Sequence, residues 1–586
     1  MQQLTTSSSA LTEESLLQIL TETRAAAETG HIERVTTLLD ERVIACADKV
    51  IDANPSRTDI MFLMANIFHA MRELDKAERY YKKVLDYEPI PLAFINLGHI
   101  CHFSGRLSQA ITYRKQAVEL RPEEPSVYHD LGCSLIFTGH KEEGIEMLRK
   151  AVEMAPNDPN IHSTYLFRLH HLADLDLQML YEEHRHWAQI HAPISLAKSY
   201  HANIPQTDRK IRVGYISGDF RTHPVAYFFE PLLEGHDRSE VEIYGYSNTS
   251  RPDRVTKRLA HKFDHYRNIL NLCDTDVVNL IEQDRIDILV DLAGHTSGNS
   301  LTVMAHKPAP IAVTYLGYPD TTGTEQIDYR LTDSLADSAS SQSFYTEELV
   351  FLSDGFLCYR PPDFAVPEGP LPALRNGFVT FGSFNNNSKI NPEILSLWVQ
   401  VLHSNDGSRL VLKSRAGDDD GVRQIYHRQF ERLGISPDRI EMHGQKPAIE
   451  YMKLYNSVDI ALDTYPYNGT TTTCDAMWMG VPVISMFGKH HASRVGLSIL
   501  TRVELESLAV SRRSEFVTKA TALAQNLEAL VDMRFSMRQR MTKSTLCNAR
   551  AFAHSVESAY RQMWHKWCLN QGVGVPNQKL GSKYSR

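Results

Sequence analysis

The feature that most constrains the fold is a proline that returns at a nearly constant interval in the first third of the chain. Pro55, Pro89, Pro122 and Pro156 are separated by 34, 33 and 34 residues, and they close the similar phrases DANP, DYEP, ELRP and EMAP. A period near 34 residues is typical of repeats made of two helices. Because apolar residues recur at helical spacing between these prolines, the sequence predicts a solenoid of helix pairs over residues 55–190.

Small residues recur where the paired helices must approach each other closely. This pattern resembles the tetratricopeptide repeat, whose concave groove usually binds peptide or protein, although a spacer without a binding role is the alternative. Residues 10–54 also show helical periodicity with a glycine break and predict an N-terminal helical cap. The small residues are Ala65, Gly98 and Gly132 in the first helix of each pair and Ala77, Ala110 and Gly144 in the second.

The pattern of apolar residues in the sequence changes after the repeats. Residues 208–365 alternate short β-rich apolar runs, such as VEIYGYSN, with helix-like segments, and residues 376–550 repeat this alternation after a proline-rich stretch. Alternating strands and helices predict parallel, doubly wound sheets, so we expect two Rossmann-like lobes with a ligand cleft between them. Residues 551–570 predict an aromatic helix that crosses back to the first lobe, and we expect residues 571–586 to be a disordered tail.

Composition and charge narrow the environment and the partners. The formal charge of −9 and pI near 6.3 give no global reason to expect nucleic acid or an anionic membrane as a partner. Eight cysteines without a CxxC spacing indicate neither a disulfide framework nor a metal site, and they suit a reducing cytosol. No signal-peptide pattern and no stretch of about 18 apolar residues is present, so we expect a cytoplasmic protein rather than a secreted or membrane protein.

The two lobes contain neither GxGxxG nor GxxxxGK[ST], which disfavours a dinucleotide oxidoreductase and a P-loop phosphotransferase. In LDTYPYNGTTTTCDAMWMG a strand ends near Asp463, and a helix starts at the threonine run. The N–H groups of that helix start, with the hydroxyls of Thr471, Thr472 and Thr473, would hold a diphosphate. Asp475 could reach a ribose hydroxyl or only favour the helix dipole. The alternative is that these threonines are cap and turn residues alone.

Three further loops that follow predicted strands carry candidate site residues. In FGSFNNNSKINP, Asn386 would contact the donor, and Lys389 could offset the negative charge of a departing nucleotide diphosphate, although alone it would be a surface lysine. In GDFRTHPV, His223 could accept a proton near neutral pH or orient the acceptor. In DLAGHTSGNS, His295 and Thr296 could contact acceptor or sugar, or could equally be loop residues.

Five motifs together resemble the O-GlcNAc transferase and SPINDLY family: GYISGDFRTHPV, DLAGHTSGNS, HKPAPIAVTYLGYPDTTG, FGSFNNNSKINP and LDTYPYNGTTTTCDAMWMGVPV. The resemblance runs from about Pro55 to Ala559. It implies an N-terminal all-α tetratricopeptide-repeat solenoid followed by an α/β GT-B region, whose C-terminal lobe binds a nucleotide-sugar. It also implies an inverting, metal-independent transfer of sugar to Ser or Thr hydroxyls of acceptor proteins, with the repeats helping to recognise them and no further cofactor.

The resemblance assigns roles to individual residues. It implies that His223 is the active-site histidine, Lys389 the lysine at the donor diphosphate, Thr471 and Thr472 the phosphate-loop threonines, and Asp475 the ribose-binding aspartate. An acceptor hydroxyl would then attack the anomeric carbon directly, while Lys389 and the helix start stabilise the leaving diphosphate. Whether His223 is the base or a positioning group stays open.

Departures from the family pattern leave the sugar donor open. Thr470 stands where O-GlcNAc transferases usually have a histidine, and Tyr451 and Leu454 replace basic residues that contact uracil. The TTTTC run and FLCY at 356–359 look closer to SPINDLY, whose members use GDP-fucose, whereas UDP-GlcNAc is more commonly assigned to relatives with this layout.

Other classes of function remain as alternatives. An N-glucosyltransferase of the same family would modify asparagine, and a nucleotide-sugar hydrolase or epimerase of the same two-lobed fold would need no repeat arm. A repeat scaffold without catalysis is the competing class. The joint presence of His223, Lys389 and Asp475 disfavours that scaffold, because a chain free of catalytic constraint would readily lose one of them.

Overall fold

The computed structural model describes residues 11–364 and 366–573 of the chain. It divides into two compact units, one ending at Thr138 and the other beginning at Gly139, and each is described by itself. Of the tail expected at 571–586, residues 574–586 lie outside the described residues.

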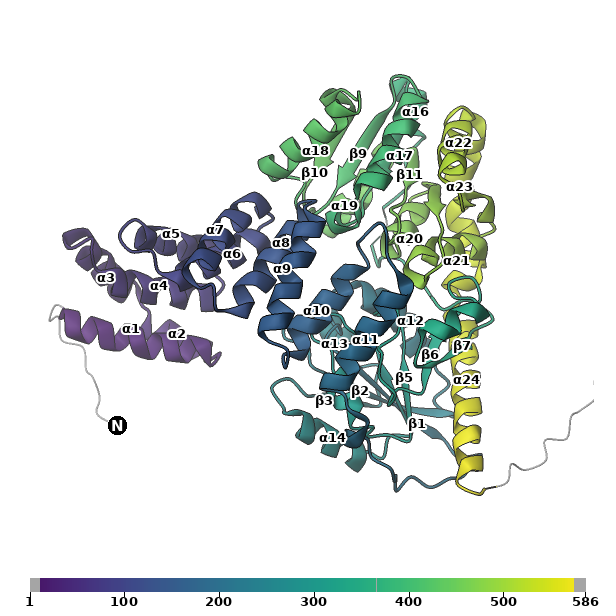
Figure 1. Ribbon diagram of the computed structural model, residues 1–586, viewed down its shortest axis with the longest axis horizontal. Coiled ribbons are helices and arrows are strands. Elements are labelled where there is room, and N and C mark those ends of the chain that lie inside the picture. Colours follow the sequence, from purple (N-terminus) through teal and green to yellow (C-terminus); the bar gives the residue numbers. More distant parts are fainter. Residues whose placement is uncertain (1–10, 365, 574–586) are drawn as a thin grey trace, which may run out of the picture. The chain divides into compact units, whose positions relative to one another are not determined.

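The first unit consists of helices joined by short turns (Figure 1). Pro91 and Pro125 each occupy the first turn of a helix, where a missing backbone N–H costs no hydrogen bond. Gly98 lies against Arg114, and a Cβ there would stand 2.9 Å from the Cγ of that arginine, so the close approach of two helices requires a small residue. The helices are α1 (Glu13–Glu28), α2 (Ile32–Leu38), α3 (Glu41–Ala53), α4 (Thr58–Ala70), α5 (Leu74–Leu85), α6 (Pro91–Phe103), α7 (Leu107–Leu120) and α8 (Pro125–Phe137).

The second unit begins with three more helices, α9 (Lys141–Met154), α10 (Pro159–Leu169) and α11 (Leu177–His191). The boundary between the compact units therefore falls inside the repeat region and not at its end near residue 190. The reason lies in tertiary contacts. The Tyr318 hydroxyl of the first lobe meets the Nε2 atoms of His170 and His184 at 3.1 and 2.7 Å, which ties these helices to the lobe.

The first lobe contains a seven-stranded parallel sheet. Its strands are β1 (Ile211–Ser217), β2 (Val241–Ser247), β3 (His265–Asn268), β4 (Ile288–Asp291), β5 (Ile311–Thr314), β6 (Tyr329–Thr332) and β7 (Glu348–Phe351). The strand order is β3-β2-β1-β4-β5-β6-β7, so the direction of winding reverses between β1 and β4. Helices α12 (Pro224–Gly235), α13 (Arg254–Ala260), α14 (Asp274–Gln283) and α15 (Leu301–Ala305) connect the strands.

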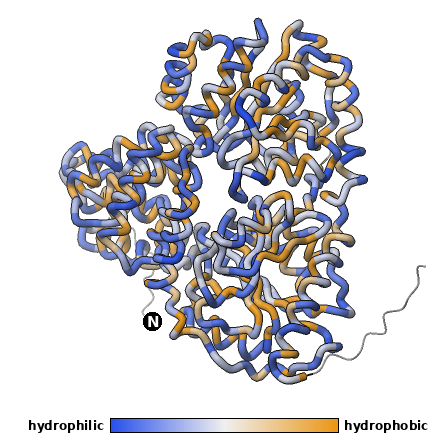
Figure 2. The backbone as a smooth tube through the Cα atoms, turned by 45° about the vertical axis from the view of Figure 1, so that its right-hand side comes forward, coloured by the Kyte–Doolittle hydropathy of each residue, from blue (hydrophilic) through white to orange (hydrophobic). Residues whose placement is uncertain are grey.

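The second lobe repeats this design with six parallel strands, β8 (Thr380–Ser383), β9 (Arg409–Lys413), β10 (Ile440–His443), β11 (Ile460–Leu462), β12 (Val483–Met486) and β13 (Ala509–Val510). Their order, β10-β9-β8-β11-β12-β13, reverses between β8 and β11. Figure 2 shows hydrophobic stretches running through both lobes. The two Rossmann-like lobes predicted from the alternation of strands and helices are confirmed. Connecting helices include α16 (Pro372–Asn376), α17 (Pro392–His403), α18 (Asp420–Arg432), α19 (Ala448–Leu454), α20 (Thr471–Trp478), α21 (Val495–Arg502) and α22 (Arg513–Ala524).

After α23 (Leu527–Lys543), the last helix, α24 (Ala549–Asn570), returns to the first lobe and packs against α12 (Figure 1). The Tyr560 hydroxyl lies 3.2 Å from that of Tyr215, and the indole of Trp564 donates to the carbonyl of Gln206 at 2.9 Å. None of the helices in residues 11–364 and 366–573 has the combination of length and hydrophobicity that a membrane-spanning helix requires.

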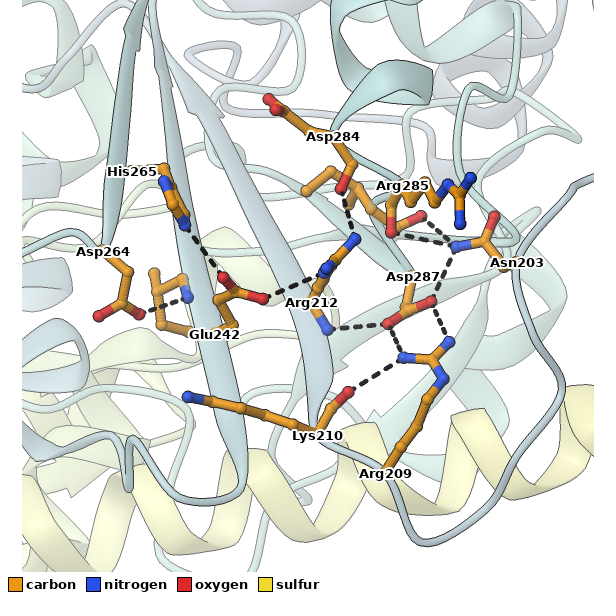
Figure 3. A network of polar contacts seen from close by, with 12 residues as sticks. Asn203, Arg209, Lys210, Arg212, Glu242, Asp264, His265, Asp284, Arg285 and Asp287 are labelled. Atoms are coloured by element: carbon orange, nitrogen blue, oxygen red, sulfur yellow. Dashed lines mark hydrogen bonds and ion pairs between the residues drawn. The ribbon is translucent and has the colours of Figure 1, made fainter.

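A polar network holds the amino-terminal ends of β1, β2 and β4 together (Figure 3). Arg209 donates two hydrogen bonds of 2.6 Å to the buried carboxylate of Asp287, and the backbone N–H of Arg212 donates to the same carboxylate at 2.8 Å. The Arg212 side chain donates to Glu242 at 3.0 Å. Charges at this edge therefore neutralise one another, whereas the residues singled out from the sequence lie at the opposite, carboxyl-terminal edge of the sheets.

Candidate active site

A cavity of about 540 Å³ lies at the carboxyl-terminal ends of strands from both lobes. Its walls come from the loops after β1, β2, β4, β5 and β7 in the first lobe and after β8, β11 and β12 in the second, with Phe167 of α10 at the side. Ligands of doubly wound sheets bind at this edge, near the reversal of strand order. The cavity brings together these predicted residues: His223, Thr296, Asn386, Lys389, Thr470, Thr471 and Thr472.

Lys389 is the last residue of a short 3-10 helix, η3 (Asn387–Lys389), that follows β8. Its Nζ donates to the carbonyl of Asn468 at 2.7 Å and lies 4.0 Å from the centre of the Tyr467 ring. Burial lowers the pKa of Lys389 to about 8, while the charge of Asp463 opposes that shift. Among the described residues no carboxylate forms an ion pair with Lys389. Lys389 therefore provides the cavity with a positive charge at neutral pH, and this charge can bind an anion.

The loop from β11 to α20 is organised by Asp463. Its Oδ1 accepts a hydrogen bond from the backbone N–H of Gly469 at 2.7 Å. A Cβ at Gly469 would lie 2.5 Å from the Thr472 hydroxyl, so this position excludes a side chain. Thr472 Oγ1 donates to Oδ1 of Asn385 at 2.9 Å, which joins this loop to the loop after β8. Thr473 instead donates to the carbonyl of Gly469 at 3.0 Å and does not line the cavity.

Asp475 is buried behind this loop and does not line the cavity. Its two carboxylate oxygens accept hydrogen bonds from the hydroxyls of Tyr359, at 2.6 Å, and Tyr451, at 2.9 Å. Burial raises the pKa of Asp475 to about 6, and the two tyrosines and the charge of Lys413 oppose that shift. Both carboxylate oxygens thus already accept hydrogen bonds from tyrosine hydroxyls, and the contact of Asp475 with a ribose stays a prediction. In the resemblance described above, Tyr451 stands where a basic residue contacts uracil, and Tyr359 belongs to the FLCY segment that looks closer to SPINDLY.

His223 caps the start of α12, directly after the loop that follows β1. Its Nδ1 lies 3.3 Å from the backbone nitrogen of Val225 and 3.4 Å from Oδ2 of Asp219. Burial lowers the pKa of His223, Asp219 raises it and Arg221 lowers it further. The two partners of Nδ1 require different tautomers. Accepting from Val225 leaves the proton on Nε2, whereas donating to Asp219 leaves Nε2 as a proton acceptor.

The two candidates in DLAGHTSGNS separate in the structure. Thr296 lines the cavity, but His295 is 1% exposed and does not. The Nε2 of His295 donates to the carbonyl of Thr322 at 2.9 Å, so its Nδ1 accepts from the hydroxyl of Ser163, 3.0 Å away. Both ring nitrogens already have partners in the core, so the structure places His295 away from the cavity, and its contact with sugar or acceptor stays a prediction.

Sequence reasoning missed several residues of the cavity wall. Asp219 and Arg221 were inside a motif that was already singled out, and Asn385 and Tyr467 flank predicted residues. His491 follows β12, and its position at the carboxyl end of a strand was the signal that could have found it. Within the described part of the chain, no group of three or more His, Cys, Asp or Glu side chains is arranged to hold a metal ion.

Comparison with protein families matches residues 184–360 and 371–556 to glycosyl transferase family 41, and residues 58–91, 92–124 and 125–158 to the tetratricopeptide repeat. A protein named probable UDP-N-acetylglucosamine–peptide N-acetylglucosaminyltransferase SPINDLY, from Hordeum vulgare, is 42% identical over 66% of this chain and 42% of its own length. A protein with the corresponding name ending in SEC, from Arabidopsis thaliana, is 28% identical over 62% of this chain and 38% of its own. The chain therefore spans less than half the length of these curated relatives.

One solved structure is similar to this chain over most of the length of both chains. A mutant of the Thermobaculum terrenum O-GlcNAc transferase superposes with a TM-score of 0.82 and 34% identity, over 89% of this chain and 99% of that one. This similarity confirms the predicted order of helical repeats followed by a GT-B region. Because the family match includes more than half of all residues, the chain belongs to glycosyl transferase family 41.

Proposed function

We propose that this protein transfers a sugar from a nucleotide-sugar to Ser or Thr hydroxyls of acceptor proteins. The observation that carries the proposal is a single cavity with Lys389 and the start of α20 on one wall and His223 on the other. Membership of glycosyl transferase family 41 and the printed names of the relatives support it.

On the donor side, the diphosphate binds between Lys389 and the first turn of α20, where Thr471 and Thr472 line the cavity. The first N–H groups of a helix have no partner within the helix and attract anions. Lys389 adds a charge where the leaving diphosphate becomes more negative. In this proposal the lysine and the helix start supply the positive charge, so the transfer needs no metal ion.

On the acceptor side, the hydroxyl attacks the anomeric carbon from the face opposite the diphosphate, which inverts that centre. His223 faces this hydroxyl from the first lobe. When Nδ1–H points to Asp219, the Nε2 atom takes the proton of the hydroxyl as a general base. When Nδ1 accepts from Val225, the Nε2–H positions the hydroxyl oxygen instead, and the departing diphosphate takes the proton of the hydroxyl.

The donor that we propose first is UDP-GlcNAc, which the names of the relatives include. GDP-fucose is the second candidate, as expected for a SPINDLY-like chain. The observation that favours this second candidate is the pair of hydrogen bonds from Tyr359 and Tyr451 to Asp475, because in the resemblance Tyr451 stands where a basic residue contacts uracil and Tyr359 belongs to the FLCY segment that looks closer to SPINDLY.

Acceptor proteins would bind the tetratricopeptide repeats, because the helical repeats match a module that commonly binds peptides. A cytoplasmic location belongs to the same proposal.

Calorimetry on the purified chain with UDP, UDP-GlcNAc, GDP and GDP-fucose tests the proposal, with the Lys389→Met variant as the control. We expect one nucleotide pair to bind and the variant to bind it far more weakly. Uridine binding would support the first donor and guanosine binding the second. Failure of the wild type to bind any of the four would overturn the transferase and favour a protein-binding scaffold.

A further inference from the structure

A second histidine of the cavity wall has a carboxylate partner in the other lobe. His491 begins a short 3-10 helix, η6 (His491–Ser493), after β12 of the second lobe. Its Nδ1 lies 2.7 Å from Oδ2 of Asp337, which belongs to the first lobe in the loop after β6. Both side chains are almost completely buried, with 3% of His491 and 1% of Asp337 exposed.

The partners of this pair determine the state of the imidazole ring. Asp337 also accepts a hydrogen bond from the Tyr345 hydroxyl at 3.0 Å and another from Thr332, so its carboxylate is well satisfied. A carboxylate accepts and cannot donate, so the proton of a neutral His491 is on Nδ1. Its Nε2 is then a hydrogen-bond acceptor. Among the described residues no side chain or backbone group bonds to this Nε2, and the ring lines the cavity.

We propose that the Nε2 atom of His491 accepts a hydrogen bond from a hydroxyl of the transferred sugar, with Asp337 as the positioning residue that fixes the ring. This inference rests on the proposed function and adds a sugar-contacting residue to it. This nitrogen faces the open cavity, so a sugar hydroxyl can replace the water that would otherwise hydrogen-bond to it.

The position of His491 favours the sugar over the other parts of a donor. The carbonyl of Ala492, the next residue, accepts from the backbone N–H of Asn468, whose own carbonyl binds Lys389. The ring therefore lies beside the diphosphate end of the cavity. Phosphate oxygens are acceptors and do not pair with an acceptor nitrogen, whereas every sugar hydroxyl can donate. Phe356, whose ring centre lies 4.9 Å from that of His491, adds the apolar wall that a sugar face can contact.

The pair also joins sugar binding to the arrangement of the lobes. The same loop of the first lobe also contacts the second lobe elsewhere: Ser498 donates to Asp333 at 2.6 Å, and Arg494 donates to the carbonyl of Leu335 at 2.9 Å. These contacts hold Asp337 within hydrogen-bonding distance of the Nδ1 atom of His491. The sugar contact is thus complete only when both lobes contribute.

The His491→Asn variant separates the contact of residue 491 with Asp337 from its contact with the sugar. An asparagine amide can still donate to Asp337 from the place of Nδ1, but it has no atom at the place of Nε2. Calorimetry should compare UDP with UDP-GlcNAc and GDP with GDP-fucose, in the wild type and in the variant. For the nucleotide that the wild type binds, we expect unchanged diphosphate affinity and a nucleotide-sugar affinity that falls about five- to tenfold, as for one lost hydrogen bond.

Three further variants test Asp337. In Asp337→Asn the new amide can donate to Nδ1 and move the ring proton to Nε2, so we expect the same selective loss of nucleotide-sugar affinity. The double variant should lose no more than either single variant, since Asp337 acts through His491. Tyr345→Phe is the matched control, because it removes another hydrogen bond to Asp337 and leaves the ring contact in place. It should retain the wild-type preference.

The outcomes are distinguishable. Equal loss of diphosphate and nucleotide-sugar binding in His491→Asn, together with a lower melting temperature, would show that the pair only holds the lobes and would overturn the inference. Unchanged binding of both ligands with lost turnover would also overturn it, because the residue would then act on the acceptor. Absence of nucleotide binding by the wild type would overturn the proposed function itself.

Discussion

The cavity wall and the junction between α10, α11 and the first lobe are both rich in histidine, but they hold these side chains differently. At the junction, His170, His184 and His295 hydrogen-bond to hydroxyl and carbonyl oxygens, and burial lowers the pKa of each. On the cavity wall, His223 and His491 lie 3.4 and 2.7 Å from a carboxylate oxygen, whereas at the junction the Asp320 carboxylate is 3.9 Å from His170. Neutral partners suit a ring that stays uncharged in a core, whereas a carboxylate can orient a ring that takes part in chemistry.

The largest effect that we expect within the cavity is that of Lys389→Met. The change removes the cation next to the diphosphate position, so transfer should fall by about 100- to 1,000-fold, the loss typical of one group that stabilises developing charge. Steady-state transfer to an acceptor peptide measures it. The melting temperature should stay near that of the wild type, because Lys389 has no ion-pair partner among the described residues. Wild-type turnover would remove Lys389 from the mechanism.

The His223→Asn variant tests whether a histidine of the cavity wall contributes to catalysis rather than to stability, unlike the histidines of the junction. Asparagine is a better helix N-cap than histidine, so α12 should keep its start while the imidazole is lost. We expect transfer to fall by about 100-fold or more, as for loss of a general base, with unchanged stability. The pH profile of kcat/KM adds a sharper measurement. Loss of the acidic limb in the variant supports the base role, and an unchanged profile supports positioning alone.

His295→Ala should show the opposite pattern. It removes a buried ring and two hydrogen bonds, so we expect the free energy of unfolding to fall by about 2–4 kcal/mol. Turnover per folded molecule should change little, since His295 does not line the cavity. Chemical denaturation and an activity assay below the melting temperature measure the two quantities. A selective loss of turnover would return His295 to the site and remove the distinction between the two regions.

The limits of sequence reasoning follow from the same comparison. The periodic prolines and the alternation of strands and helices predicted the repeats and both lobes, because those patterns are local. Loops after strands placed Lys389, Thr471 and Thr472 correctly at the carboxyl-terminal edge. The separation of His295 from its neighbour Thr296 could not be predicted, because no periodicity determines which way a loop side chain points. The unit boundary inside the repeats was also hidden, since it depends on contacts between distant segments.

The junction should make stability depend on pH. Burial lowers the pKa of His184 to about 4 and that of His162 to about 3, below the 6.5 of a free imidazole. The unfolded chain therefore takes up protons below pH 6.5 that the folded chain does not. Stability from these groups is complete above about pH 6.5 and falls toward pH 4, by about 1.4 kcal/mol per pH unit for each histidine.

Melting temperatures between pH 7.5 and 4.5 measure this loss. Groups next to the junction set its background: His170 lies 3.9 Å from Asp320, and burial raises the pKa of that aspartate to about 7. His184→Gln is the matched variant, because it removes one titrating ring. Its slope should be shallower than that of the wild type, and an identical slope would mean that His184 does not contribute.

Thr472→Val should produce the smallest effect, and it tests how the donor wall is held. The change keeps the shape of the side chain but removes the 2.9 Å hydrogen bond to Asn385, which joins the loop after β11 to the loop after β8. It also removes a hydroxyl that lines the cavity. Nucleotide affinity should weaken by about fivefold, equivalent to about 1 kcal/mol. If Asn385→Asp weakens affinity more than Thr472→Val does, the added negative charge acts directly on the diphosphate. If both variants bind as tightly as the wild type, the backbone N–H groups of α20 and Lys389 hold the diphosphate alone.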